Sequence, residues 1–211
     1  MDKGNYMQNF FLDSRINKGL TYEDYFSGFK AKAETEDFST FPIEEHDHLK
    51  MAKLNFQRSS RIHRTFSPSV EIKELISEIT EPQIWIVISE DWCGDSAQNI
   101  PYIAELAKLN PSIELKIFPR DANPDIIDMY LTNGTRSIPK LVAFDTDGNE
   151  LFQWGPRPNQ SVELIAKLKA EGKTKEEFLE QLHLWYGRNR GSELLKELSE
   201  LIKNVLVNAR S

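Results

Sequence analysis

Cysteine is scarce in this chain: Cys93 is the only one among 211 residues. A single thiol excludes an internal disulfide, so no covalent link within the chain can hold the fold together. This low cysteine content is typical of proteins in a reducing compartment, where thiols stay free. We therefore expect a cytoplasmic protein whose stability comes from one packed core.

Long apolar runs and an excess of basic residues are also missing. No stretch reaches the roughly 18 to 20 apolar residues that cross a bilayer, and the first residues lack the apolar segment of a secretory signal. Lysine and arginine number 26 against 33 acidic residues, which gives a formal net charge of −7. Nucleic-acid binding generally needs a concentrated basic surface. We therefore expect neither a nucleic acid nor a membrane as partner.

The spacing of apolar residues predicts the secondary structure. Aromatic residues at helical spacing over 22–29 and apolar residues at helical spacing farther on predict helices at 22–29, 43–66 and 70–80. β-Branched runs, alternation and a turn at 147–148 predict strands at 83–89, 113–118, 141–144 and 150–154. The remaining helical patterns cover about 94–109, 123–130, 161–170, 174–186 and 192–209.

The order of these elements predicts an α/β fold with one mixed sheet. A βαβ unit is joined through a helix to a ββα unit, so parallel and antiparallel pairs share the sheet. We expect a main domain at 69–171, an N-terminal helical extension at 1–68, and C-terminal helices at 172–211 that pack on the domain. The apolar stripe of the last helix is better explained by this packing than by a dimer interface, and the oligomeric state stays open.

Cys93 lies where the apolar strand over 83–89 breaks into a helix. The unpaired N–H groups and dipole of a helix N-terminus favour the thiolate, typically by about 0.3 to 1 kcal/mol. Asp95 opposes this: a carboxylate at about 6 Å, in an effective dielectric constant of about 40, disfavours the thiolate by roughly 1.4 kcal/mol. Ser96 either donates a hydrogen bond to the thiolate or merely fills the first helical turn. The sequence leaves the direction of the net pKa shift open.

Four short motifs, in order and at suitable intervals, carry a family resemblance. Residues 92–96, Trp-Cys-Gly-Asp-Ser, resemble the Trp-Cys-Gly-Pro-Cys active-site turn of the thioredoxin superfamily. Residues 121–124 and 134–141 resemble the start of its next helix and the segment with its cis-proline, and 147–155 its last hairpin and the following glycine. More narrowly, the chain is similar to bacterial thioredoxin-like proteins with a single-cysteine turn. The resemblance spans about 70–170 and implies a thioredoxin fold with helical extensions.

The chain departs from that family pattern at two positions. Ser96 replaces the second cysteine of the turn, and Val87 replaces the buried carboxylate six residues before the nucleophile. Dithiol reduction by the usual route is therefore not expected. What remains is a monothiol cycle of thiol–disulfide exchange, in which Cys93 forms a mixed disulfide that an external thiol resolves.

The resemblance also implies which residues form the site. Cys93 and Ser96 would be catalytic, and the backbone of Ile138 beside a cis Pro139 would dock an extended peptide or a small thiol. The rest of the turn would complete the binding surface: Trp92, Gly94 and Asp95. Trp92 is explained equally well by core packing. We expect a protein disulfide or small thiol as substrate, and no cofactor other than glutathione or another low-molecular-weight thiol as co-substrate.

Other interpretations compete with this one. A non-catalytic binding or chaperone-like module would use the same groove without turnover, so enzymatic activity is not decided by the sequence. A peroxidase thiol ranks last, because Glu90 stands where a Thr-x-x-Cys pattern needs threonine. His46 and His48 face different ways on a helix and predict no metal site. A solvated helix face explains the arginines at 58, 61 and 64 better than an anion site does.

Overall fold

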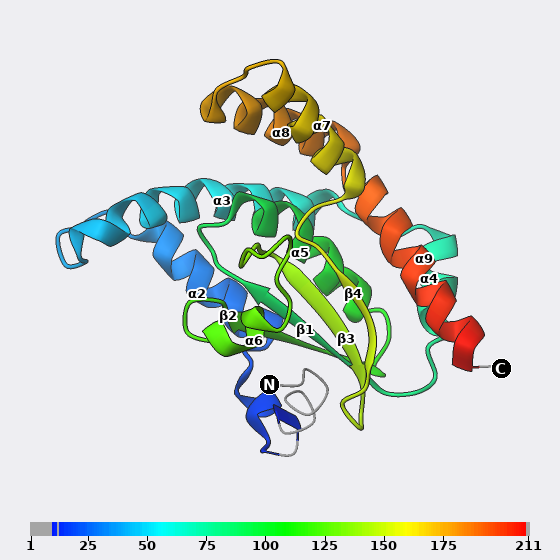
Figure 1. Cartoon of the computed structure of the whole chain (residues 1–211). Coiled ribbons are helices and arrows are strands. Elements are labelled where there is room, and N and C mark those ends of the chain that lie inside the picture. Colours follow the sequence, from blue (N-terminus) through cyan, green and yellow to red (C-terminus); the bar gives the residue numbers. More distant parts are fainter. Residues whose placement is uncertain (1–9, 12, 210–211) are drawn as a thin grey trace.

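A computed structural model describes residues 10–11 and 13–209, and a four-stranded sheet forms its centre (Figure 1). The strands are β1 (Gln83–Ser89), β2 (Ile113–Pro119), β3 (Lys140–Asp145) and β4 (Glu150–Trp154), in the order β2-β1-β3-β4. β1 pairs in parallel with β2 and antiparallel with β3, and β4 pairs antiparallel with β3. The mixed sheet expected from the element order is confirmed.

Helices flank this sheet and extend beyond it (Figure 1). The described α-helices are α2 (Tyr22–Glu34), α3 (His46–Thr65), α4 (Val70–Ser77), α5 (Gly94–Ala107), α6 (Pro124–Asp128), α7 (Asn159–Ala170), α8 (Lys175–Asn189) and α9 (Ser192–Ala209). Short 3₁₀ turns precede α2 and α3, η1 (Arg15–Lys18) and η2 (Ile43–Glu45). Most expected elements appear within a few residues of their predicted bounds.

Two hydrophobic clusters form the core, one on each face of the sheet. Trp85 and Val87 of β1 belong to one cluster, and Ile86 and Ile88 belong to the other. Successive side chains of a strand point to opposite faces, so a strand covered on both faces needs an unbroken apolar run. This explains why 83–89 has no polar alternation and why β1 lies inside the sheet rather than at its edge.

The segment before α2 reaches the edge of the sheet. Leu20 and Ile117 of β2 exchange backbone hydrogen bonds, with N···O distances of 2.9 and 2.8 Å. The sequence gives no strand pattern in this region, so the pairing was not predicted. A single bridge of this kind needs only one extended residue, which leaves no periodicity to detect.

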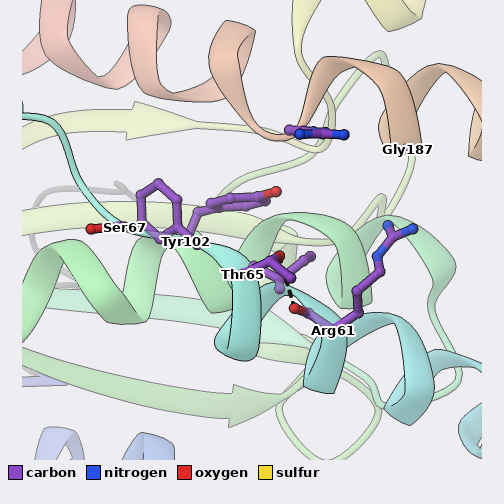
Figure 2. Close-up of a pocket in the computed structure, with 8 residues that line it drawn as sticks. Arg61, Thr65, Ser67, Tyr102 and Gly187 are labelled. Atoms are coloured by element: carbon purple, nitrogen blue, oxygen red, sulfur yellow. Dashed lines mark hydrogen bonds between the residues drawn. The ribbon is translucent and has the colours of Figure 1, made fainter.

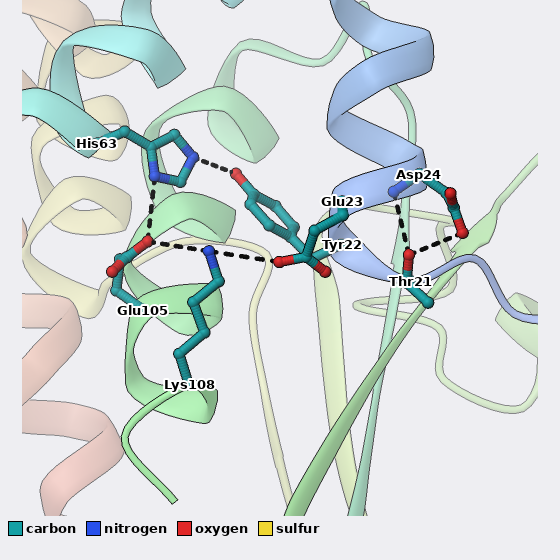
Figure 3. Close-up of polar contacts among 7 residues, drawn as sticks. All are labelled: Thr21, Tyr22, Glu23, Asp24, His63, Glu105 and Lys108. Atoms are coloured by element: carbon teal, nitrogen blue, oxygen red, sulfur yellow. Dashed lines mark hydrogen bonds and ion pairs between the residues drawn. The ribbon is translucent and has the colours of Figure 1, made fainter. Parts of the chain in front are cut away.

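A network of hydrogen bonds and ion pairs links α2 and α3 to α5 (Figure 3). The Tyr22 hydroxyl lies 2.7 Å from His63 Nε2, and His63 Nδ1 lies 3.2 Å from Glu105 Oε1. Burial lowers the pKa of His63 despite the charge of Glu105. Lys108 ion-pairs with both Glu105 and Glu23. This network thus attaches the N-terminal helices to α5, the helix that begins after Cys93.

The C-terminal helices contribute to the core and to a smaller cluster. Leu194, Leu198 and Ile202 of α9 are buried in the same cluster as Trp85. α8 packs on α7, and a separate small cluster contains Tyr186 from α8. The domain boundaries at 68/69 and 171/172 stay predictions. The contacts described here run between the predicted segments and do not show where one domain ends and the next begins.

Candidate active site at Cys93

The structure brings two separate segments of the predicted site together at the thiol. Cys93 has an extended backbone and precedes the first residue of α5, so it is the N-cap of that helix. Its half-buried thiol donates a hydrogen bond to the Ile138 carbonyl oxygen, with an Sγ···O distance of 3.4 Å. The peptide bond between Ile138 and Pro139 is cis. The turn at 92–96 therefore faces the segment that enters β3.

The close approach of β4 to this segment explains a glycine. Gly155, directly after β4, has φ 113°, a conformation that residues with a side chain rarely adopt. A Cβ atom at this position would lie 2.3 Å from the Pro139 carbonyl oxygen. Gly155 thus allows the backbone after β4 to pass directly beside Pro139.

The environment of the thiol favours its protonated form. Burial raises the pKa of Cys93, and the charge of Asp95 raises it further. The Ser96 side chain and the backbone N–H groups of Asp95 and Ser96 act in the opposite direction but do not outweigh burial. The hydrogen bond to Ile138 also needs the thiol proton and so favours the neutral form. The direction of the pKa shift of Cys93, which the sequence left open, is therefore upwards, and the protonated thiol is favoured.

Asp95 lies beneath the turn rather than on its surface. Its side chain is buried, accepts a hydrogen bond from the Tyr186 hydroxyl at 2.8 Å and forms an ion pair with Arg157 at 2.6 Å. Asn99 donates a second hydrogen bond to the Tyr186 oxygen at 3.1 Å. A buried carboxylate is tolerated when it is paired and hydrogen-bonded in this way. Asp95 therefore ties α8 and the loop after β4 to the start of α5.

Arg157 connects this network to the thiol. Burial alone would lower the pKa of Arg157, but the negative charges of Asp95 and of ionised Cys93 raise it. The guanidinium therefore stands close enough to both groups to stabilise an anion on either. It offsets part of the repulsion between Asp95 and a Cys93 thiolate.

α3 covers the turn from one side. Asn55 donates a hydrogen bond from its side chain to the Asp91 carbonyl oxygen at 3.1 Å, and Ser59 donates one to the Ala97 carbonyl oxygen at 3.1 Å. Both polar side chains are buried. Arg58 donates to Asn55 Oδ1 at 2.8 Å and is half-buried beside the turn. α3 is therefore part of the site.

Trp92 stands between two cationic or ionisable groups. His48 of α3 stacks on its ring, with a centroid distance of 4.7 Å and an interplanar angle of 15°. The Arg120 guanidinium lies 4.8 Å from the ring centroid. Trp92 is half-buried and also packs against the cluster that contains Ile86. It thus belongs both to the wall of the site and to the core, the two roles that the sequence left open.

α8 covers the turn from another side. A Cβ atom at Gly94 would lie 2.9 Å from His183 Cε1, so the glycine allows α8 to come this close. Burial lowers the pKa of His183 to about 4, with contributions from Arg58 and Arg157. His183 is therefore neutral at pH 7, and its buried Nδ1 has no hydrogen-bond partner within the described residues.

The six other residues predicted for the site are thus near Cys93, but the predicted residues do not all face the same space. Ser96 and Asp95 are buried, whereas Trp92, Cys93 and Gly94 are partly exposed. Whether any of them binds a substrate stays a prediction. Five further residues surround the turn and were not predicted as part of the site: Asn55, Arg58, Arg157, His183 and Tyr186. Only Arg58 had a signal, its place in the arginine pattern.

The described part of the chain shows neither a metal-ligand cluster nor a membrane-spanning helix. Within residues 10–11 and 13–209, no group of three or more histidine, cysteine or acidic residues is arranged to hold a metal ion. In the same part of the chain, no helix is both long and apolar enough to cross a bilayer. Neither finding adds a residue to the site at Cys93.

Two solved structures are similar to this chain at low sequence identity. The crystal structure of an HIV epitope scaffold is 18% identical and superposes with a TM-score of 0.51, over 88% of this chain and 99% of that chain. A crystal structure of a protein of unknown function from Pseudomonas aeruginosa is 19% identical, with a TM-score of 0.49 over 91% and 99% of the two chains. At 18% identity, the first of these structures supports the fold alone. No curated protein matches the sequence.

The sequence itself matches a protein family over residues 44–169, which is more than half of the chain, and that family is described as Thioredoxin. The match starts inside η2 and ends near the end of α7, so it includes α3 and excludes α8 and α9. Together with the mixed sheet and its flanking helices, it confirms the fold and the family resemblance. The chain belongs to the thioredoxin superfamily.

Proposed function

We propose that this protein carries out thiol–disulfide exchange through the single thiol of Cys93. The observation that best supports this function is the position of the thiol. It is half-buried, caps α5 and lies 3.4 Å from the Ile138 carbonyl oxygen. A disulfide bound at Sγ would therefore lie beside the Ile138 backbone, which can bind and orient an extended chain or small thiol.

The exchange takes place in two steps, and each step keeps the number of S–S bonds constant. Cys93 first loses its proton to solvent, and its thiolate attacks a disulfide P–S–S–R at the sulfur of R. A bond forms between Cys93 Sγ and the sulfur of R, the S–S bond of P–S–S–R breaks, and P leaves as the thiolate P–S⁻, which takes up a proton. The thiolate of a small external thiol then attacks the sulfur of R, forms a new disulfide with it and releases the Cys93 thiolate.

The external thiol is needed because Ser96 cannot attack the mixed disulfide. We assign Ser96 the role of stabilising the Cys93 thiolate, since its side chain opposes the raised pKa of Cys93. Glutathione or another low-molecular-weight thiol would be oxidised while the thiol P is released in reduced form. The cytoplasm, which keeps such thiols reduced, is the compartment that suits this cycle.

A second candidate is a binding module that uses the groove without turnover. The raised pKa of Cys93 favours it, because a mostly protonated thiol attacks disulfides slowly at neutral pH. Coverage of the turn by Asn55 of α3 and His183 of α8 also favours it, since a large substrate has less access. Under this function, Cys93→Ala would leave partner binding unchanged.

One experiment separates the two functions. Because Cys93 is the only cysteine, every adduct detected by mass spectrometry reports on it. The folded protein, with unfolded protein as reference, is incubated with oxidised glutathione from pH 7 to pH 10, and then with reduced glutathione. A mixed disulfide that forms faster as the pH rises and is removed by reduced glutathione supports exchange. If the folded protein forms no adduct even at pH 10 while the unfolded protein does, exchange is excluded and the binding module remains.

A further inference from the structure

A cavity separate from Cys93 opens between the C-terminal part of α3, the middle of α5 and the end of α8 (Figure 2). Its volume is about 430 Å³. Polar and charged side chains come from every wall: Arg61, Thr65 and Ser67 from α3 and the residues after it, Tyr102 from α5, and Arg190 after α8. None of the residues around the thiol lines it. The cavity therefore needs an explanation of its own.

Two arginines in this cavity lack counter-ions. Within the described residues, neither Arg61 nor Arg190 has a carboxylate within ion-pair distance or donates a side-chain hydrogen bond, and no acidic residue lines the cavity. Burial and the charge of Arg61 together lower the pKa of Arg58, so a third cation is close by. An uncompensated cluster of this kind on a chain of net charge −7 creates a local site of attraction for anions.

Tyr102 lies between these charges. Burial raises its pKa, while Arg61 and Arg190 both act to lower it, which places the two guanidinium groups near the same hydroxyl. Its ring meets Phe66 edge to face, with a centroid distance of 4.8 Å. The cavity thus offers two cationic forks and a hydroxyl donor beside an aromatic wall.

Two backbone features at the cavity leave it open and make α8 less stable. Gly187 lies inside the helix, where glycine is less favourable than alanine. A Cβ atom there would meet only Arg61 Nη1, at 4.0 Å, so packing does not require the glycine. Arg190 has φ 52°, in the left-handed region where glycine or asparagine usually ends a helix. Both residues act against helix stability and in favour of an open, positively charged space.

We propose that this cavity binds a small phosphate ester, with its phosphate between Arg61 and Arg190 and its organic part against Tyr102. Guanidinium forks bind phosphate oxygens in pairs, which suits two converging arginines. The volume falls within the range of about 300–1,000 Å³ typical of small-molecule sites. An organic phosphate fills such a space, whereas inorganic phosphate alone leaves the aromatic wall unused.

Calorimetric titration of the full chain tests this assignment. The probes are adenosine 5′-monophosphate, glucose 6-phosphate and, as a carboxylate, citrate. We expect at least one ester to bind saturably, with a Kd about tenfold higher in Arg61→Gln and in Arg190→Gln. All four arginines are exposed, but Arg64 and Arg188 do not line the cavity, so the matched controls Arg64→Gln and Arg188→Gln should leave Kd unchanged. Equal Kd values in all variants, or binding of citrate but of neither ester, would overturn the proposal.

A second variant tests the location without touching either arginine. Gly187→Leu places a side chain in the cavity from the helix side, so it should abolish ester binding while the melting temperature stays equal or rises. Ester binding that survives in Gly187→Leu would show that the ligand lies elsewhere. Cys93→Ala should bind the ester as tightly as the original chain, because the cavity does not involve the thiol.

Discussion

The Tyr186 hydroxyl donates a hydrogen bond to Asp95 Oδ1 over 2.8 Å, which joins α8 to the first turn of the helix that Cys93 caps. Both residues are buried. The electrostatic environment of the thiol therefore depends on a helix that lies outside the family match and far along the chain.

Tyr186→Phe should lower the free energy of unfolding by about 1.5–3 kcal/mol, because it leaves a buried carboxylate without one of its donors. Urea denaturation followed by circular dichroism measures this change. Tyr102→Phe is the control, since the Tyr102 hydroxyl donates to no described residue, and its effect should stay within about 0.5 kcal/mol. Equal effects of the two substitutions would contradict a stabilising Tyr186–Asp95 contact.

Asp95→Asn should lower the pKa of Cys93, because it removes the negative charge that opposes the thiolate. A shift of about one pKa unit would make alkylation by iodoacetamide about tenfold faster at pH 7. Asp91→Asn serves as control: Asp91 pairs with Lys32, and its charge is not among those that shift the pKa of Cys93. An unchanged rate in Asp95→Asn, measured on folded protein, would remove Asp95 as a cause of the raised pKa.

His183 should make folding stability depend on pH. Its folded pKa of about 4 is below the ordinary value of 6.5, so the unfolded chain binds more protons between these values. The contribution of His183 is therefore full above pH 6.5 and is lost as the pH falls towards 4. Urea denaturation at pH 7.5 and pH 5 should show a smaller loss in His183→Gln than in the original chain. His48→Gln, at an exposed histidine, should behave like the original chain.

Two glycines near the α8–α9 corner should respond in opposite directions to alanine. Gly187→Ala should raise the free energy of unfolding by about 0.5–1 kcal/mol, because helical alanine loses less conformational entropy and finds open space. Gly191→Ala should lower it by about 1 kcal/mol or more, since Gly191 has φ 81° and its Cβ would lie 2.7 Å from the Tyr102 ring. Thermal melts of the two variants measure these effects. Melting temperatures that shift in the same direction would contradict the different roles assigned to Gly187 and Gly191.

The parts of the site that consist of short contiguous motifs could be predicted from the sequence. Cys93 at a strand-to-helix break and Pro139 before a strand are both visible as short motifs. Arg157, His183 and Tyr186 reach the turn from elements that follow β4, and each occupies a position that an ordinary loop or helix residue could fill. Their convergence depends on how α7 and α8 pack, which no local pattern encodes.

The arginines of α3 show a second limit of pattern analysis. Each step of three residues rotates the side chain by about 300°, so such a row winds slowly around the helix. Arg61 and Arg64 are exposed, as a solvated face predicts. Arg58, however, is half-buried beside Gly94, and the exposed Arg61 also lines a cavity. The regular spacing alone does not show these differences.

The backbone pairing between Leu20 and Ile117 has a practical consequence. β2 is an edge strand, and free N–H and C=O groups along an edge are a template on which another molecule can add a strand. Leu20 occupies the middle of that edge, yet it lies outside the family match, which starts at residue 44. A fragment cut at the bounds of the match would therefore leave the backbone N–H and C=O groups of Ile117 unpaired on that edge, where another strand can add.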